Sequence, residues 1–249
     1  MPDEIGLVHV YPDLLGTYGD RGNVLALVRR ANARGVRTRV VEVPADAALP
    51  RHGDIYLIGG GEDSAQLLAA RSLRKDKRAA EVLGRQPCLA VCAGLQLLAE
   101  RFDDAEGRPQ PGLGVLDATC ARMPERAVGE IVTEPHALSG VPTLTGYENN
   151  RGTAVLGPDA RPLGVVVAGV GNGSQRWEGG VQGRTIATYL HGPVLVRNPA
   201  LADVLLTWTV GELPAFEDVD VERLRTERLD AADPRRRGAR RIFQSRRVA

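Results

Sequence analysis

The chain has 249 residues and a mass of 26.7 kDa, with 43% hydrophobic and 25% charged residues and a net charge of +1. These globular proportions exclude a disordered chain, a collagen-like chain and a disulfide scaffold, and no apolar run approaches the roughly 18 residues of a membrane span. A near-neutral charge and 4% aromatic residues argue against a nucleic-acid binder. Acid in residues 1–4, where a signal peptide carries base, and an odd number of cysteines indicate a cytoplasmic protein.

Apolar runs alternate with helical patterns over the first hundred residues. Asp20 is expected to cap a helix that ends at Gly35, the C′ residue. We further expect helices over residues 64–83 and 93–101, and strands at residues 5–10, 36–43, 54–58 and 87–91. Continuous apolar strands separated by helices indicate a parallel sheet that is covered on both faces.

The pattern changes after Phe102, where glycine and proline separate short apolar runs. These runs predict a mixed or antiparallel extension with strands at residues 115–118, 129–132, 153–156 and 163–167. One more buried strand is expected at 185–190 and an amphipathic helix at 199–210. Because there is no linker or internal repeat, residues 1–211 are predicted to form one domain. Residues 212–249 are a charged C-terminal segment that can be helical over 212–232.

The strongest chemical feature is Cys92, which stands between a predicted strand and a predicted helix. A cysteine at such a turn, with small neighbours, matches a nucleophile elbow that lifts the side chain out of the sheet. The helix N-terminus favours the thiolate, and the N–H of Ala93 can hold an oxyanion. The alternative is a small buried cysteine that only packs, as we expect for Cys88 and Cys120.

Two further segments can complete the site. Three glycines at 59–61 follow a strand but match neither a P-loop nor a dinucleotide fingerprint, so their amides suit an oxyanion; a tight turn is the alternative. His191 ends an apolar strand 99 residues after Cys92, as the distant base of a thiol nucleophile does. Histidines and cysteines lack metal-ligand spacing, so no metal site is expected.

In this order, these features resemble the class I (Cys-type) glutamine amidotransferases. The sequence Cys-Ala-Gly-Leu-Gln at 92–96 is similar to that family's nucleophile motif, and the loop at 59–61 to its oxyanion loop. Histidine followed by Gly-Pro at 191–193 resembles the cobyric-acid-synthase-like branch. The resemblance implies a flavodoxin-like α/β fold: a mostly parallel central sheet flanked by helices, with extra antiparallel strands.

Within that branch, four segments resemble the GatD-type glutamine amidotransferase subunit of lipid II isoglutaminyl synthase. They are residues 18–23, 126–131, 146–149 and 189–193, and the resemblance covers residues 5–211. One departure is Asn150, where His is expected. The resemblance implies a glutaminase in which Cys92 attacks the side-chain amide and His191 protonates the departing ammonia and later activates water. Backbone amides of Gly60 and Ala93 would stabilise the oxyanion.

The resemblance also implies substrate contacts and a partner. Arg126 would bind the α-carboxylate of glutamine and Gln96 would line the pocket; the alternatives are a surface arginine and a solvent-facing helix residue. Ammonia would pass to a Mur-ligase-like (MurT-type) partner. With ATP and Mg, that partner would amidate the α-carboxylate of D-glutamate in the lipid II stem peptide. This chain would then need no cofactor and would reach lipid II only through the partner.

The usual triad acid, two residues after the histidine, is absent because Pro193 stands there. A partner carboxylate could orient His191, with Asp20 or Glu148 as local alternatives, and the chain alone would then be a weak glutaminase. Two other functions stay open. One is a Cys-dependent hydrolase of another amide, and the other is a non-catalytic scaffold, against which the intact cysteine and histidine argue.

The C-terminal end is strongly basic. Residues 233–249 hold seven arginines and one acid, a net charge of +6, while the rest of the chain carries −5. Such a run is either a solvated end, or it docks to an acidic face of the partner or to anionic lipid.

Overall fold

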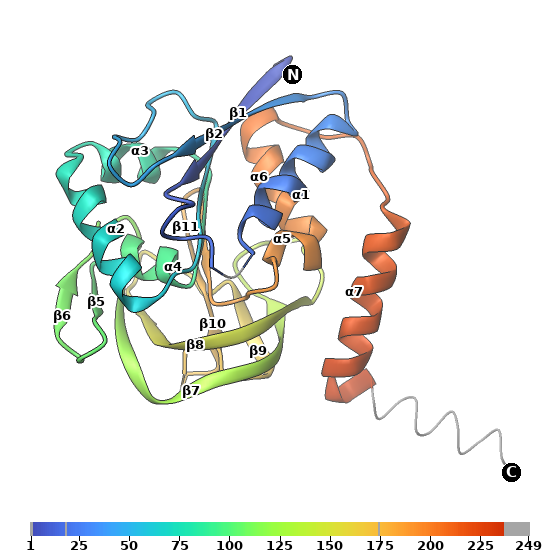
Figure 1. Ribbon diagram of the computed structural model, residues 1–249. Coiled ribbons are helices and arrows are strands. Elements are labelled where there is room, and N and C mark those ends of the chain that lie inside the picture. Colours follow the sequence, from blue (N-terminus) through green and yellow to red (C-terminus); the bar gives the residue numbers. More distant parts are fainter. Residues whose placement is uncertain (1, 18, 174, 237–249) are drawn as a thin grey trace, which may run out of the picture.

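A six-stranded sheet in the order β11-β12-β4-β3-β1-β2 forms the centre of the computed structural model, which describes residues 2–17, 19–173 and 175–236 (Figure 1). All neighbouring strands in it are parallel except β11 and β12. Its strands are β1 (Glu4–Val10), β2 (Arg37–Val43), β3 (Ile55–Ile58), β4 (Cys88–Val91), β11 (Gly180–Gln182) and β12 (Thr185–Thr188). The five parallel strands have the flavodoxin-like order, which confirms the expected fold class.

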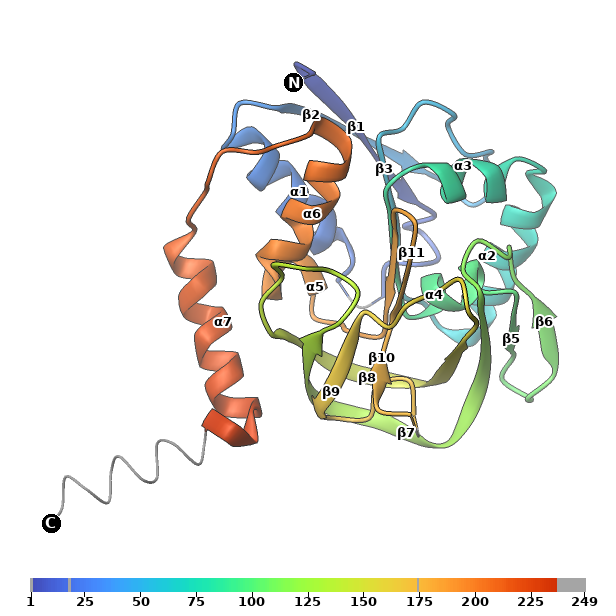
Figure 2. The ribbon, with the colours of Figure 1, turned by 180° about the vertical axis from the view of Figure 1, so that it is seen from behind.

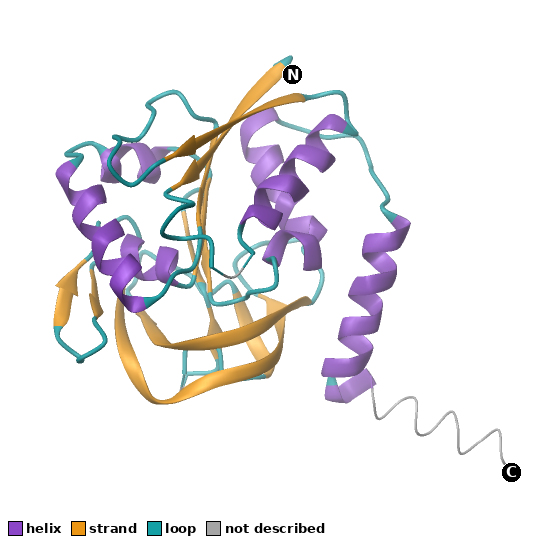
Figure 3. Cartoon of the chain, in the orientation of Figure 1, coloured by secondary structure: helices purple, strands orange, loops and turns teal. Residues whose placement is uncertain are grey.

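Helices cover both faces of this sheet (Figure 3). On one face lie α1 (Arg21–Asn32), α5 (Val194–Arg197) and α6 (Pro199–Val210), and on the other α2 (Asp63–Lys75), α3 (Ala79–Arg85) and α4 (Ala93–Leu98). Every residue of β3, β4 and β12 is buried, because both of their faces pack against helices. The loops that follow these three strands therefore meet at one edge of the sheet.

A second sheet lies across that edge, below the first in Figure 1. Its order is β10-β9-β7-β5-β6, and β8 pairs with β7. The strands are β5 (Arg101–Asp103), β6 (Pro109–Pro111), β7 (Ala118–Pro135), β8 (Leu144–Leu156), β9 (Gly164–Ala168) and β10 (Trp177–Glu178). All its pairs are antiparallel except β5–β7, so the mixed extension was predicted correctly, although it forms a sheet of its own.

Two local predictions are wrong, and one contact explains both. The helix after Cys92 ends at Leu98 rather than at residue 101, and residues 115–117 form no strand. The N–H groups of Val115 and Leu116 both donate to the Leu98 carbonyl, each at 2.9 Å. The chain thus folds back to satisfy the last carbonyl groups of α4, and a strand at 115–117 would leave them unpaired.

Four other predicted elements have boundaries that differ from the observed ones. The helix expected over 64–83 is interrupted between α2 and α3, because Asp76 is extended and accepts the N–H of Arg78 at 3.0 Å. The strands expected at 129–132 and 153–156 are short parts of β7 and β8. The strand expected to reach residue 190 ends at Thr188.

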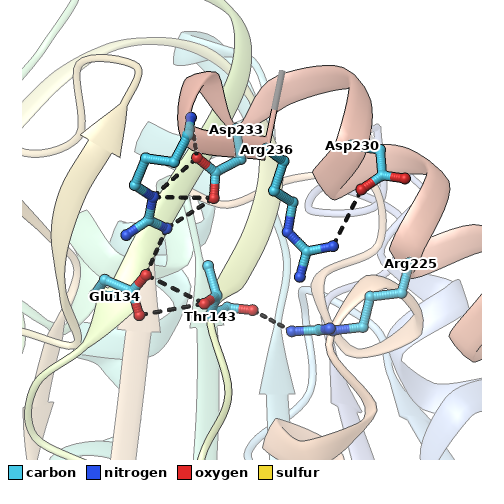
Figure 4. A network of polar contacts seen from close by, with 7 residues as sticks. Glu134, Thr143, Arg225, Asp230, Asp233 and Arg236 are labelled. Atoms are coloured by element: carbon cyan, nitrogen blue, oxygen red, sulfur yellow. Dashed lines mark hydrogen bonds and ion pairs between the residues drawn. The ribbon is translucent and has the colours of Figure 1, made fainter. Parts of the chain in front are cut away.

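Helix α7 (Val219–Ala232) stands beside the rest of the molecule (Figure 2). Asp218 at its start pairs with Arg29 of α1 at 2.8 Å. Beyond its end, Arg236 pairs with Asp230 at 3.1 Å (Figure 4). Arg235 pairs with Glu134 of β7 at 2.6 Å and with Asp233 at 2.7 Å. The first arginine of the predicted basic tail thus contacts this chain itself, and residues 237–249 lie outside the described residues. Over the described part of the chain, no helix has the length and apolarity to cross a membrane.

Candidate active site

Cys92 occupies the sharp turn between β4 and α4. Its φ of 54° and ψ of −105° are unusual for a non-glycine residue, and its N–H donates to the Thr188 carbonyl of β12 at 2.8 Å. A Cβ on Gly94 would lie 2.6 Å from the carbonyl oxygen of Ile58, so only glycine lets α4 approach β3 this closely. The turn has the geometry expected of a nucleophile elbow.

The thiol of Cys92 is buried, and this outweighs the effect of the helix N-terminus. Burial raises the pKa of Cys92 to about 12, the N–H of Ala93 opposes this rise, and the carboxylate of Asp20 adds to it. Helix α4 has only six residues. Burial thus opposes the thiolate that the helix N-terminus was expected to favour.

His191 leaves the same edge of the sheet from the neighbouring strand. Thr188, at the end of β12, lies opposite Val91 of β4. The backbone of His191 exchanges two hydrogen bonds with Tyr147 of β8, at 2.9 and 3.1 Å. Burial, and then the charge of Arg126, lower the pKa of His191 to about 4. At neutral pH the imidazole is therefore uncharged and can accept a proton.

A pocket opens beside Cys92 and brings three of the predicted residues together: Cys92, Gln96 and Arg126. His191 does not line it, although the charge of Arg126 lowers the pKa of both His191 and Cys92. The remaining lining residues are Gly61, Glu62, Asp63, Gln66, Asp103, Arg122, Asn149, Asn150, Arg151 and Gly152.

Arg126 enters this pocket from an irregular part of β7. The pairing of β7 with β8 shifts register between Arg122 and Ala127, and such bulges re-aim side chains beside active sites. The Nε of Arg126 donates to Asn149 Oδ1 at 2.8 Å, and Nη2 donates to the Asn149 carbonyl at 3.3 Å. Asn149 thus orients the guanidinium without neutralising its charge, as recognition of a carboxylate requires.

Gln96 forms part of the pocket wall and does not face solvent freely. Its Oε1 accepts from Gln66 Nε2 at 2.6 Å, and its Nε2 donates to the Tyr189 hydroxyl at 3.4 Å. Gln66 was not recognised from the sequence, and Asn149 lies in the segment 146–149 but was given no role there. Apart from that resemblance, each is a polar residue in an amphipathic helix or an alternating strand, which is common on any surface.

The predicted oxyanion loop is bound to Asp20. The N–H of Gly60 donates to Asp20 Oδ2 at 2.9 Å. Asp20 stands at the N-cap position of α1 as expected, but its side chain makes no capping bond. Burial raises the pKa of Asp20 to about 6, against the effect of the Gly60 N–H. The amide of Gly60 must leave this carboxylate before it can serve an oxyanion.

The second local candidate for a triad acid, Glu148, is likewise bound to backbone amides. Its carboxylate accepts the N–H groups of Val170 at 2.8 Å and Gly171 at 2.6 Å. Asn150, where we expected His, is buried and donates to the Gly152 carbonyl at 2.8 Å. Among the described residues, no three His, Cys, Asp or Glu side chains are grouped so as to hold a metal ion.

Comparison with known proteins relates this geometry to a family. The family model described as the CobB/CobQ-like glutamine amidotransferase domain matches residues 6–199. The chain is 34% identical to the lipid II isoglutaminyl synthase (glutamine-hydrolyzing) subunit GatD of Streptococcus pneumoniae, over 92% of each chain. It is also 34% identical to the subunit of that name from Staphylococcus aureus, over 82% of this chain and 83% of the other. Cobyric acid synthase of Brucella canis is 34% identical over 61% of this chain and 32% of that enzyme.

Solved structures support the fold. A glutamine amidotransferase crystal structure has a TM-score of 0.53 and 19% identity, covering 81% of this chain and 98% of the other. A glutamine amidotransferase from Thermotoga maritima also has a TM-score of 0.53, with 15% identity, covering 90% and 93%. At such identities the likeness concerns the fold alone.

Proposed function

Because this chain belongs to the CobB/CobQ-like family of glutamine amidotransferases, we propose that it is the glutaminase subunit of a lipid II isoglutaminyl synthase. The observation that carries this proposal is the pocket that joins the strained residue Cys92 to Arg126. A thiol nucleophile beside a cation that can bind a carboxylate suits an amino-acid amide such as glutamine. The two similar GatD subunits match most of this chain, which supports the same role here.

The first half of the reaction transfers the acyl group from nitrogen to sulfur. His191 takes the thiol proton while the sulfur of Cys92 attacks the side-chain carbonyl carbon of glutamine, and a C–S bond forms. The N–H of Ala93 stabilises the oxyanion, and the N–H of Gly60 joins it after leaving Asp20. The C–N bond then breaks, and the proton on His191 moves to the departing ammonia.

Water completes the reaction. His191 takes a proton from water, whose oxygen attacks the thioester carbon. The C–S bond breaks, the proton returns to the sulfur of Cys92, and glutamate leaves. Arg126 holds the α-carboxylate through both halves, and Gln96 forms the wall against which the substrate lies.

The chain alone is poorly prepared for the first proton transfer. With pKa values of about 12 for Cys92 and about 4 for His191, both groups stay neutral and the thiolate–imidazolium pair is unfavourable. Pro193 stands where related triads carry an acid. A partner carboxylate close to His191 would raise its pKa and favour the ion pair. The chain without its partner is therefore a weak glutaminase under this proposal.

The remaining chemistry belongs to a Mur-ligase-like (MurT-type) partner. That subunit would use ATP and Mg to activate the α-carboxylate of D-glutamate in the lipid II stem peptide, which ammonia then amidates. This chain would supply ammonia without a cofactor of its own. Its three cysteines are buried free thiols, in keeping with a cytoplasmic location.

Glutamate release from L-glutamine tests the proposal. The full chain, with Cys92→Ala as its control, would be measured with and without a Mur-ligase-like partner. We expect slow release that depends on Cys92 and rises when the partner is added. Rapid release by the chain alone would contradict a site that needs a carboxylate from the partner. No release in either condition would contradict glutamine as the substrate.

A further inference from the structure

The segment between β12 and His191 is held by a carboxylate. After β12 ends at Thr188, the N–H of Tyr189 donates to Glu178 Oε1 at 2.7 Å. The hydroxyl of Thr188 donates to the same oxygen at 2.7 Å and accepts the N–H of Leu190 at 3.0 Å. Glu178, Thr188, Tyr189 and Leu190 are all fully buried, so water cannot replace these bonds.

Glu178 is itself fixed by the loop that precedes it. The side chain of Asn172 donates to the Gly179 carbonyl at 3.0 Å and accepts the Gly179 N–H at 2.9 Å. The N–H of Asn172 donates to the Trp177 carbonyl at 2.6 Å. Asn172 therefore holds the backbone on both sides of residue 178 by hydrogen bonds. Because the side chain of Glu178 is also fully buried, it has little freedom to move.

The same loop connects back to the strand beside His191. Val170 and Gly171 donate their N–H groups to Glu148, and the residue before Glu148, Tyr147, pairs its backbone with His191. Hydrogen bonds thus connect β8 to the loop at 170–172, this loop to residues 177–179, and Glu178 to the end of β12. His191, three residues after β12, bonds back to β8.

We propose that Glu178 is a positioning residue that fixes the backbone of His191 for proton transfer, and that it acts as a hydrogen-bond acceptor and not through its charge. Both donors bind Oε1, whereas Oε2 has no partner among the described residues. Glutamine would keep the acceptor oxygen at the same place. Leucine would keep the approximate shape and remove the acceptor. The inference rests on the proposed glutaminase function.

The test compares Glu178→Gln with Glu178→Leu in the full chain with its partner. We expect Glu178→Leu to lower kcat by about 10- to 100-fold while KM for glutamine changes by less than about threefold, because misplacement affects the reacting group more than substrate binding. Glu178→Gln should keep kcat within about threefold of the wild-type value. A wild-type kcat in Glu178→Leu, or equal losses in both variants, would overturn the proposal.

Two controls separate positioning from folding. Asp104 is a buried carboxylate that accepts the N–H groups of Glu106 at 3.0 Å and Arg108 at 2.9 Å, within the β5–β6 hairpin. Asp104→Leu should lower the melting temperature and leave kcat unchanged once activity is scaled to the folded fraction. If Glu178→Leu does not fold, Thr188→Val takes its place, since it removes one of the two donors. Its kcat should fall without a change in KM, and a wild-type kcat would overturn the proposal.

A readout that needs no activity distinguishes failure of this inference from failure of the proposed function. The imidazole resonances of His191, assigned by comparison with His191→Gln, report its surroundings in any variant. They should shift in Glu178→Leu and stay near the wild-type positions in Glu178→Gln. Unchanged resonances in Glu178→Leu would overturn the inference even if the chain proved inactive toward glutamine.

Discussion

The two sheets contribute different parts of the site. The proposed nucleophile and histidine follow β4 and β12 of the first sheet, four-residue strands in which every side chain is buried. The second sheet supplies Arg126 and its orienting partner Asn149 from β7 and β8, where Val128 is 61% exposed and Tyr147 38%. The groups proposed to react thus come from a buried core, and the proposed substrate contacts come from a half-exposed surface, where change disturbs the core less.

This comparison is tested most strongly at the two cysteines of the first sheet. Cys92→Ala should reduce kcat for glutamine hydrolysis by more than about 10³-fold, since it removes the nucleophile. Cys88→Ala, at a fully buried position four residues earlier, should retain kcat and lose about 1 kcal/mol of stability. Steady-state kinetics and urea unfolding check both variants. Comparable activity losses in the two would contradict a catalytic role confined to Cys92.

The pH dependence of stability tests the contact between the two sheets at Glu178, which joins β10 to the end of β12. Burial raises the pKa of Glu178 from 4.5 to about 7, against the hydrogen bonds of Thr188 and Tyr189 and with a small contribution from Glu148. The folded chain therefore binds this proton more tightly than the unfolded chain does. Its stabilising contribution is complete below about pH 4.5 and is lost as the pH rises through 7, by about 3 kcal/mol.

Glu178→Gln should remove this dependence. The free energy of unfolding of the variant, relative to wild type, should rise between pH 5 and pH 8 in urea titrations. His191 and Asp20 titrate in both proteins, so the difference between the two curves isolates Glu178. A constant difference across that range would show that the carboxylate is already ionised at pH 5.

The proposed role of Arg126 in binding the substrate predicts a smaller loss of activity than the loss of Cys92. Arg126→Ala should raise KM for glutamine and lower kcat/KM by about 10- to 100-fold, because a charge-assisted pair with the α-carboxylate is lost. Arg101→Ala, an exposed arginine of β5 outside the pocket lining, serves as the matched control and should behave as wild type. A loss confined to kcat in Arg126→Ala would place its role in the chemical step instead.

The smallest predicted effect is a difference in stability between alanine variants of two helical glycines, one before and one after β4. Gly94→Ala should destabilise the chain by roughly 1–3 kcal/mol, because the new Cβ would lie 2.6 Å from the Ile58 carbonyl. Gly84→Ala in α3 meets no atom closer than 3.8 Å and should stabilise by about 0.5–1 kcal/mol through helix propensity. Denaturant unfolding of both variants should give changes of opposite sign. The same sign would mean that α4 can move away from β3.

Local patterns were sufficient for five of the six strands of the first sheet, and β11 was not predicted. The runs that predicted β3 and β4 are continuously apolar, those of β1 and β12 are mostly apolar, and β2 was recognised although charged residues interrupt it. The Cys92 turn follows directly from a strand, a cysteine and two small residues. The family, the fold and the role as a glutamine amidotransferase subunit are confirmed. The assignments of Cys92, His191, Arg126, Gln96, Gly60 and Ala93 stay predictions, as does the division of the chain at residue 211.

The second sheet was predicted less well because its pairing is decided at long range. β7 runs over 18 residues with a shift of register in its middle, and only residues 118 and 129–132 of it were predicted as strand. Val115 and Leu116 are apolar enough for a strand, yet their N–H groups donate to the Leu98 carbonyl at the end of α4. A local pattern records hydrophobicity but not which carbonyl group is left without a partner.

The sequence by itself therefore determined most of the parallel strands, the turn at Cys92 and the place of His191 after an apolar strand. Each of these depends on residues that are neighbours in the chain. Only the tertiary structure decided that Asp20 binds the N–H of Gly60, that Gln66 holds Gln96, and that Glu178 holds the segment before His191. The first two pairs join residues 40 and 30 positions apart. Such partners are chosen by which buried groups the packing leaves unsatisfied, and no spacing along the chain encodes that choice.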